Sequence, residues 1–284
     1  MRAPRALASL ALAAACGCSL LSFDGVDARP GDAAADAPAD APFDAEAGPD
    51  ARDADADTPD GSLPVTKGLV LWARASPADV AIDAGIERWR DRTAGKIDLV
   101  QPTPARRPQW APAALGGRGG VRVASGAAMS FEKDLFENSV GGGVSIFLVC
   151  DLTQAGTWLS FGGVADAFVI EATPSGVVIT TGSSSTPPFP VVGLGARHVY
   201  AIVLDASRAL VVRDGADGGA APGAWAPPAA SRARRDFAGV QPEDGGAAAS
   251  SAVGDYGELV VYDRAVTAAE LDALVAHLSK TWGL

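Results

Sequence analysis

Cysteine and histidine are scarce in this sequence. Its 284 residues include three Cys and two His, and none of them has the short, regular spacing of a zinc site or a disulfide framework. We therefore expect neither structural zinc nor a disulfide-stabilised fold. Cys150 stands alone inside an apolar run and is expected to be a small buried hydrophobic residue, not a reactive thiol.

An excess of basic residues is also missing. The formal net charge is −11, and nucleic acid is not expected as a partner because it requires a basic surface. The acidity is concentrated in residues 24–61, where eleven Asp and one Glu stand against Arg29 and Arg52, a net charge of −10. Residues 62–284 hold 22 acidic and 19 basic residues, so this part of the chain is close to neutral.

No hydrophobic run reaches the roughly 20 residues that a membrane-spanning helix needs. The apolar run Ala6–Ala15 is about half that length and follows the basic start Met1–Arg5. A short basic region, a short apolar region and then small residues form the organisation of an export signal peptide.

The residues after this apolar run resemble the lipobox of bacterial lipoproteins. Cys18 follows Gly17 and precedes Ser19, which fits that pattern slightly better than the alternative, Cys16. The resemblance implies that residues 1–18 are a lipoprotein-type signal peptide and that a lipid on the Cys anchors the protein to a bacterial membrane, with the outer membrane as the expected location. Neither Cys has the preferred Leu three residues before it, so ordinary signal cleavage and secretion stay open as the alternative.

Residues 19–61 are expected to be a disordered tether. They consist mainly of Asp, Ala and Pro, and repeats such as Asp36–Pro42 contain no large apolar side chain. Such a segment cannot bury enough surface to offset the entropy of ordering, and its like charges keep it extended. Calcium binding by the Asp residues is the rival interpretation, but the Gly turns and fixed offsets of a calcium loop are missing.

From residue 62 onward, β-forming runs alternate with Gly, Pro and Asp turns, which is typical of a sandwich or barrel. Val144–Leu152 is apolar at almost every position and is expected to be a central strand covered on both faces. Asp205–Arg208 is expected to be a hairpin turn, and residues 215–250 a long surface loop with one strand near Arg235–Gly239. The other expected strands are Gly68–Ala73, Gly120–Ala124, Thr157–Phe161, Ala167–Ala172, Val177–Thr181, His198–Leu204, Ala209–Arg213 and Glu258–Tyr262.

The last thirty residues carry the clearest local signals. Asp255–Arg264 is expected to form a strand. Thr267 and Glu270, which follow it, have the spacing of a capping box. Gly283 is a suitable residue to end the helix. The apolar residues between Thr267 and Gly283 predict one buried helix face. They are Leu271, Leu274, Val275, Leu278 and Trp282.

Both ends of residues 62–284 resemble LamG-like domains of the concanavalin A-like lectin and glucanase group. The motifs that carry this resemblance are Gly68–Trp72, Trp89–Arg92, Arg106–Trp110, Gly120–Val123, Tyr256–Arg264 and Lys280–Leu284. The resemblance implies an all-β, two-sheet antiparallel jelly-roll sandwich with a short C-terminal α-helix, in which the first and last strands are neighbours. Arg74 departs from the family pattern, which often has an acidic residue after the first strand.

One segment matches a catalytic pattern. Glu132, Asp134 and Glu137 fit E-x-D-x-x-E, the catalytic strand of jelly-roll β-glucanases, where two Glu flank the scissile bond. Lys133 stands where that strand needs an apolar residue, and a Gly-rich loop follows. We therefore interpret the segment as a solvated acidic turn and expect no catalytic residue and no enzyme activity, with a glycoside hydrolase acting on β-glucan as the less favoured alternative.

The remaining candidates are weaker still. His198 and His277 have no partner at ligand spacing, and the run Ser183–Thr186 lacks the sequence of a nucleophile elbow. Trp158 and Trp225 are expected to pack in the interior, although either could stack on a sugar, and Trp72, Trp89 and Trp282 are expected to lie in the core or at its edges. Calcium is the one cofactor left open, because five Asp stand near strand ends, although Asp is also an ordinary turn residue: Asp151, Asp166, Asp205, Asp214 and Asp217.

Taken together, these expectations favour a non-catalytic recognition domain at the cell envelope that binds a glycan or an extracellular protein. A structural envelope component without a soluble ligand is the alternative. The sequence assigns no ligand-binding residue and no metal ligand.

Overall fold

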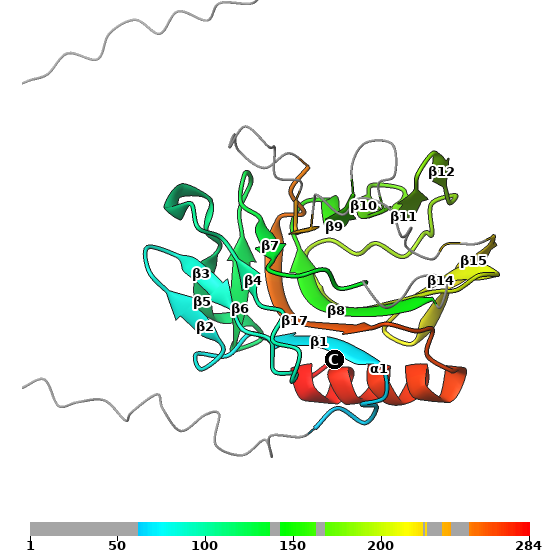
Figure 1. Ribbon diagram of the computed structural model, residues 1–284, viewed down its shortest axis with the longest axis horizontal. Coiled ribbons are helices and arrows are strands. Elements are labelled where there is room, and N and C mark those ends of the chain that lie inside the picture. Colours follow the sequence, from blue (N-terminus) through cyan, green and yellow to red (C-terminus); the bar gives the residue numbers. More distant parts are fainter. Residues whose placement is uncertain (1–61, 137–142, 163–167, 224, 226–234, 240–249) are drawn as a thin grey trace, which may run out of the picture. The chain divides into compact units, whose positions relative to one another are not determined.

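The computed structural model describes residues 62–136, 143–162, 168–223, 225, 235–239 and 250–284. The expected signal peptide and tether lie outside these residues. The described part is a sandwich of two antiparallel β-sheets with one C-terminal α-helix (Figure 1). This is the fold class that the sequence predicts.

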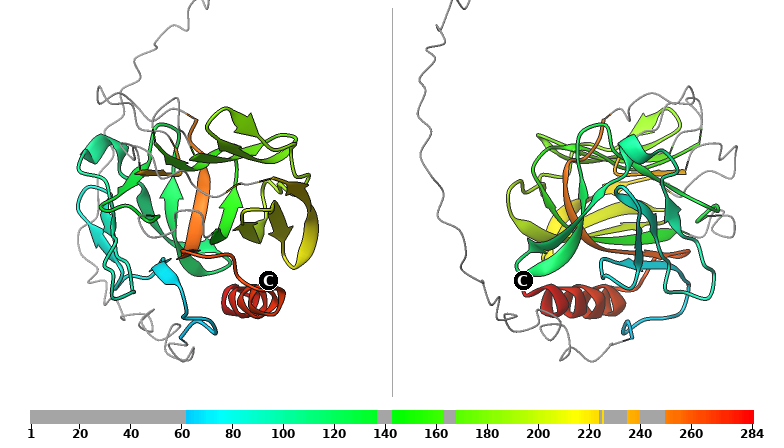
Figure 2. Two further views of the ribbon diagram at one scale, coloured as in Figure 1. Left: turned by 45° about the vertical axis from the view of Figure 1, so that its right-hand side comes forward. Right: turned by 90° about the vertical axis from the view of Figure 1, so that its left-hand side faces the viewer.

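The first sheet, sheet A, carries the helix α1 (Ala268–Trp282) on its outer side (Figures 1 and 2). Its strands follow the order β15-β14-β13-β8-β17-β6-β5, and β1 also pairs with β17. The strands are β1 (Leu69–Arg74), β5 (Gln109–Leu115), β6 (Arg118–Val123), β8 (Val144–Leu152), β13 (Arg197–Leu204), β14 (Arg208–Arg213), β15 (Ala216–Pro222) and β17 (Gly254–Tyr262).

The second sheet, sheet B, has the order β12-β11-β10-β9-β16-β7-β4-β3-β2. A short 3₁₀ helix, Pro104–Arg106, precedes β5. The strands of sheet B are β2 (Val80–Ile82), β3 (Ile86–Trp89), β4 (Leu99–Val100), β7 (Met129–Phe131), β9 (Gly156–Phe161), β10 (Phe168–Thr173), β11 (Gly176–Thr181), β12 (Ser184–Ser185) and β16 (Arg235–Phe237). None of the helices among the described residues is long and apolar enough to cross a membrane.

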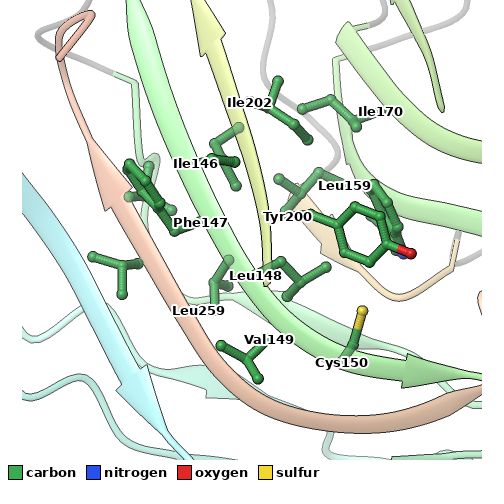
Figure 3. Close-up of a cluster of buried hydrophobic side chains, with 14 of the residues drawn as sticks. Ile146, Phe147, Leu148, Val149, Cys150, Leu159, Ile170, Tyr200, Ile202 and Leu259 are labelled. Atoms are coloured by element: carbon green, nitrogen blue, oxygen red, sulfur yellow. The ribbon is translucent and has the colours of Figure 1, made fainter. Parts of the chain in front are cut away.

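Strand β8 lies in the middle of sheet A, as its apolar sequence predicts, and eight of its nine residues are buried. Figure 3 shows that Leu148 and Cys150 point towards Leu159 of sheet B, whereas Phe147 points to the other side of the strand. The second side is the one that α1 covers, with buried side chains that include Leu274. Because both faces of sheet A are covered, the side chains of a central strand are buried on both sides, and most of them are apolar.

The first and last strands of the domain are neighbours, which the family resemblance implies. β1 pairs antiparallel with β17, and Trp72 lies opposite Val260. The buried carboxylate of Glu258 accepts hydrogen bonds from the indole Nε1 of Trp72 and from the indole Nε1 of Trp282, the latter at 2.7 Å. One carboxylate therefore joins β1, β17 and the end of α1.

Two further contacts stabilise this junction of β1, β17 and the end of α1. The guanidinium of Arg92 lies 5.1 Å from the centre of the Trp72 ring, and Arg197 donates to the carbonyl oxygens of Leu115 and Trp282 at 3.0 and 2.6 Å. A cation at the C-terminal end of a helix is favourable because the last carbonyl groups are otherwise unpaired.

The helix begins with the predicted capping box. Thr267 Oγ1 accepts from the Glu270 N–H, and Glu270 accepts from the Thr267 N–H. Gly283 ends the helix in the left-handed conformation, also as predicted. Glu270 in addition forms an ion pair with Arg264 at 2.7 Å, and this pair, followed by the capping hydrogen bonds, lowers the pKa of Glu270 to about 2.

This lowered pKa predicts an acid-dependent loss of stability. A carboxylate whose pKa is depressed by folding stabilises the protein above its unfolded-state pKa, and the contribution disappears as the pH falls towards about 2. Glu270→Gln is therefore expected to flatten part of the decline in unfolding free energy between about pH 5 and about pH 2. Urea unfolding at several pH values measures this, with Asp272→Asn as the control. Identical pH profiles for wild type and Glu270→Gln would contradict it.

The prediction of one long loop over residues 215–250 is wrong in its first part, because residues 216–222 form strand β15 at the edge of sheet A. The strand consists mainly of Ala and Gly, whose β-propensity is low, and backbone pairing with β14 holds it in place. The expected strand near Arg235 is present as β16. Strands that the sequence did not indicate are β2, β3, β4, β5, β7 and β12.

Candidate functional site

The two outer faces of the sandwich differ. The helix α1 lies against the outer face of sheet A, and no described helix lies on the outer face of sheet B (Figures 1 and 2). On the inner side of sheet B, six strands contribute buried apolar side chains, namely Trp89, Leu99, Phe237, Leu159, Ile170 and Ile179. Residues next to these in each strand must point outward, because side chains alternate along a strand.

A polar row crosses the outer face of sheet B at one level of the strands. The residues are cross-strand partners, so their side chains share one face. In order from β3 to β12 the row comprises Arg88, Val100, Ser130, Asp236, Ser160, Val169, Thr180 and Ser185. We call this set the outer row.

The middle of the outer row holds a carboxylate and two hydroxyl groups. Ser130 Oγ donates to Asp236 Oδ1 at 3.0 Å, and Ser160 lies opposite Asp236 on the next strand. Asp236 and Ser160 are only 3% and 4% exposed. The two acids near the other end of the row, Asp98 and Glu132, pair with Arg88 at 2.7 and 2.8 Å.

The end of the row on β10, β11 and β12 is accessible. Thr180 and Ser185 exchange a hydrogen bond between their hydroxyl oxygens at 2.8 Å, and Ser185 is exposed. Glu171 lies on the same face of β10, between Val178 of β11 and Thr157 of β9. We define Val169, Glu171, Thr173, Val178, Thr180 and Ser185 as the β10–β12 face. It offers hydroxyl groups, one carboxylate and short aliphatic side chains.

Sequence reasoning found only part of this face. It noted the run Ser183–Thr186 but assigned no function to it, and the structure divides that run. Ser184 and Ser185 form β12, whereas Thr186 is buried and its Oγ1 accepts from the Ile179 N–H at 3.1 Å. Glu171 was missed, although it alternates with the buried Ile170 and Ala172 within an expected strand.

The E-x-D-x-x-E segment does not form a continuous strand in its described part. Strand β7 ends at Phe131, before Glu132. Glu132 pairs with Arg88, and Asp134 accepts from the Phe136 N–H at 2.8 Å, as a turn residue does. Glu137 lies outside the described residues. Leu135 and Phe136 are buried, so the segment is not solvated throughout.

His198 has a partner that the sequence did not indicate. Its Nδ1 lies 2.6 Å from Asp214 Oδ2, and Asp214 Oδ1 accepts from the Val199 N–H. Cys150 is the cross-strand neighbour of His198, but complete burial raises the pKa of the Cys150 thiol well above its usual value. The thiol is therefore protonated at neutral pH, and Cys150 is a core residue, as expected. His277 lies half-buried on α1.

The aspartates considered for calcium act mainly as turn residues. Asp205 Oδ1 accepts from the Ser207 and Arg208 N–H groups at 2.7 and 2.9 Å, and Asp217 accepts from Gly219 at 2.7 Å. Asp151 is half-buried in β8, and Asp166 lies outside the described residues. Within the part of the chain that the structure describes, no three His, Cys, Asp or Glu side chains are grouped so as to hold a metal ion.

The tryptophans are packing residues. Trp158 and Trp225 are 1% and 7% exposed, and the Trp158 ring lies 4.9 Å from that of Tyr200. Trp89 and Trp282 are fully buried, and Trp72 is half-buried. The large apolar side chains that are exposed among the described residues are Ile82, Leu194 and Leu284, so no aromatic platform accompanies the β10–β12 face.

No family model matches the sequence, and no curated protein is similar to it. Solved structures are similar in fold. A mutant of Trypanosoma rangeli sialidase displaying trans-sialidase activity has a TM-score of 0.53 at 12% identity, covering 78% of this chain and 34% of the sialidase chain. The binding domain of botulinum neurotoxin DC in complex with rat synaptotagmin II has a TM-score of 0.51 at 9% identity, covering 75% of this chain and 52% of the toxin chain.

The same toxin domain in complex with SialylT has a TM-score of 0.50 at 9% identity, covering 74% of this chain and 52% of the toxin chain. This chain therefore spans about a third of the sialidase chain and about half of the toxin chain. At these identities the likeness concerns the fold alone. The described part of the chain shares with these structures the fold of an antiparallel two-sheet β-sandwich.

Proposed function

We propose that this sandwich is a non-catalytic recognition domain of the LamG-like type that binds a glycan or an extracellular protein through the outer face of sheet B. The observation that carries the proposal is the contrast between the two sheets. Apolar side chains on the outer face of sheet A pack under α1, whereas the outer side of sheet B has accessible polar side chains on the β10–β12 face. A fold alone does not determine a function, so the proposal depends on these side chains.

The chemistry of the β10–β12 face suits a hydroxyl-rich ligand. Hydroxyl groups such as those of Thr180 and Ser185 both donate and accept hydrogen bonds, and the carboxylate of Glu171 accepts on both oxygens. The strands of a sheet are about 4.8 Å apart, a spacing similar to the length of one sugar unit in an extended chain. A linear glycan lying across the strands would therefore meet a new polar side chain at each strand. The binding domain of botulinum neurotoxin DC was solved in complex with SialylT, and this fold is thus compatible with such a role.

A glycan array with residues 62–284, the expected recognition domain, tests this proposal with and without calcium. The double variant Thr180→Val and Ser185→Ala removes one half-buried and one exposed hydroxyl group of the row. It is expected to weaken binding at least about tenfold, because each lost hydrogen bond to a ligand costs about 1 kcal/mol. Ser279→Ala on α1 is the control. Absence of binding to every glycan and to envelope extracts would favour the alternative, a structural envelope component without a soluble ligand.

We also propose that the domain has no hydrolase activity. The ion pair between Glu132 and Arg88 supports this, because a carboxylate held by a guanidinium is a poor general acid. Release of reducing sugar from β-glucan by wild type, abolished by Glu132→Gln and Glu137→Gln, would overturn the proposal in favour of a glycoside hydrolase.

The location is a further part of the proposal. Residues 1–18 are proposed to direct export, Cys18 to carry the lipid and residues 19–61 to hold the domain away from the outer membrane, with secretion as the alternative. Mass spectrometry of the mature N-terminus measures this directly. Loss of the lipid in Cys18→Ser but not in Cys16→Ser is the expected result, and an unmodified N-terminal residue other than Cys would contradict it.

A further inference from the structure

We infer that Glu171 makes the β10–β12 face selective for neutral glycans and excludes glycans that carry carboxylates, such as sialylated or uronic-acid chains. This inference rests on the proposed recognition function and deepens it. It concerns one residue that neither the sequence motifs nor the similar structures assign to a site.

Glu171 is placed at the centre of this face by its strand partners. It lies opposite Val178 on one side and opposite Thr157 on the other, and the chain neighbours on its own face are Val169 and Thr173. The pairing of β9 with β10 shifts register beside Glu171, so that Trp158 is an extra residue in β9. Such a bulge re-aims the neighbouring side chains and is frequent next to binding sites.

Among the described residues, the carboxylate of Glu171 has no hydrogen-bond or ion-pair partner, in contrast to most other acids of this sheet. Asp236 accepts from Ser130, Asp98 and Glu132 pair with Arg88, and Glu171 has no such partner among the interactions of the described residues. The only cation in the outer row, Arg88, is already held by two acids. An unpaired acid in a half-buried position of a sheet has no evident structural role.

These surroundings determine which ligand the carboxylate accepts. Two oxygens of a free carboxylate can accept from two neighbouring hydroxyl groups of a sugar ring, while the methyl groups of Val169 and Val178 contact its C–H groups. A ligand carboxylate placed on the same spot meets a like charge in partly desolvated surroundings, where charge repulsion is weakly screened. Neutral sugars therefore bind, and acidic sugars are rejected.

The test uses titration calorimetry at low and high salt and compares two pairs of ligands. One pair consists of oligosaccharides of galactose and of galacturonic acid of equal length, and the other of lactose and sialyllactose. We expect wild type to bind the neutral member of each pair at least about tenfold more tightly. Glu171→Gln keeps a hydrogen-bonding side chain and is expected to reduce this ratio to about twofold, and Glu171→Lys to reverse it. High salt is expected to weaken the charge-dependent preference of wild type and of Glu171→Lys, and to leave that of Glu171→Gln nearly unchanged.

The control is Asp272→Asn, which removes an exposed acid from α1 without touching sheet B. Acidic glycans that bind wild type as tightly as neutral ones, or a ratio unchanged in Glu171→Gln, would overturn the inference while leaving the recognition function standing. Wild type that binds neither member of any pair, and no glycan on the array, would overturn the recognition of glycans itself. Circular dichroism of each variant separates these results from misfolding.

Discussion

Replacing Glu258 with alanine is expected to lower the free energy of unfolding by about 3–5 kcal/mol. The carboxylate is 1% exposed and accepts from two indole N–H groups, those of Trp72 and Trp282. Its removal leaves a void and at least one donor, Trp282 Nε1, buried without a partner, and each loss costs energy separately. Chemical unfolding followed by tryptophan fluorescence measures the change.

The matched control for this experiment is Glu258→Gln, which has nearly the same shape. Its amide offers one acceptor in place of two, so about half of the loss is expected. In Trp282→Phe the second donor is already gone, and the Glu258→Ala substitution should then cost less, because the two residues act as a pair. Equal effects of Glu258→Ala in wild type and in Trp282→Phe would show that the carboxylate does not join the helix to the sheet.

Gly176→Ala is expected to cost about 3–5 kcal/mol, because two penalties coincide. Gly176 has a φ of +144°, and an added Cβ would lie 2.0 Å from the carbonyl oxygen of Phe189. That oxygen accepts from Val177, so the segment after β12 cannot move away without breaking its pairing with β11.

Gly195→Ala is the matched control, since its φ of +74° is also positive but an added Cβ would have no atom within 4 Å. Only the backbone strain applies there, and a loss of about 1 kcal/mol is expected. Similar losses for the two variants would mean that the contact with Phe189 relaxes freely. Thermal unfolding of both variants under one set of conditions gives the comparison.

Much of the fold could be predicted because its signals are local. The apolar run of β8, the hairpin turn at Asp205 and the capping box of Thr267 each need only a few adjacent residues to be recognised. The pairing of β1 with β17 is a long-range contact, and the resemblance of the two ends to one family predicted it.

Elements formed through tertiary contacts could not be predicted in this way. β15 has a sequence of Ala, Gly and Pro that favours a loop, and its partner β14 makes it a strand. The short strands β2 and β4 have two or three residues, too few to show alternation.

The candidate site also combines a local signal with a tertiary one. Alternation places Glu171 opposite to Ile170 in any strand, but it does not say which sheet α1 covers and which outer face stays accessible. A polar side chain without a partner would be unfavourable under α1 on sheet A. On the outer face of sheet B the same side chain is available to a ligand. Only the arrangement of the two sheets and the helix distinguishes these cases.

The junction at Glu258 also sets the order of assembly. The indole of Trp72 and its acceptor are 186 positions apart in the chain, and β17 pairs with β1, β6 and β8 alike. A nascent chain therefore has two incomplete half-sheets until its last strand has been synthesised, and contacts of such long range form slowly. During that interval sheet A has unpaired strand edges, and the chain depends on protection from aggregation until β17 pairs with them.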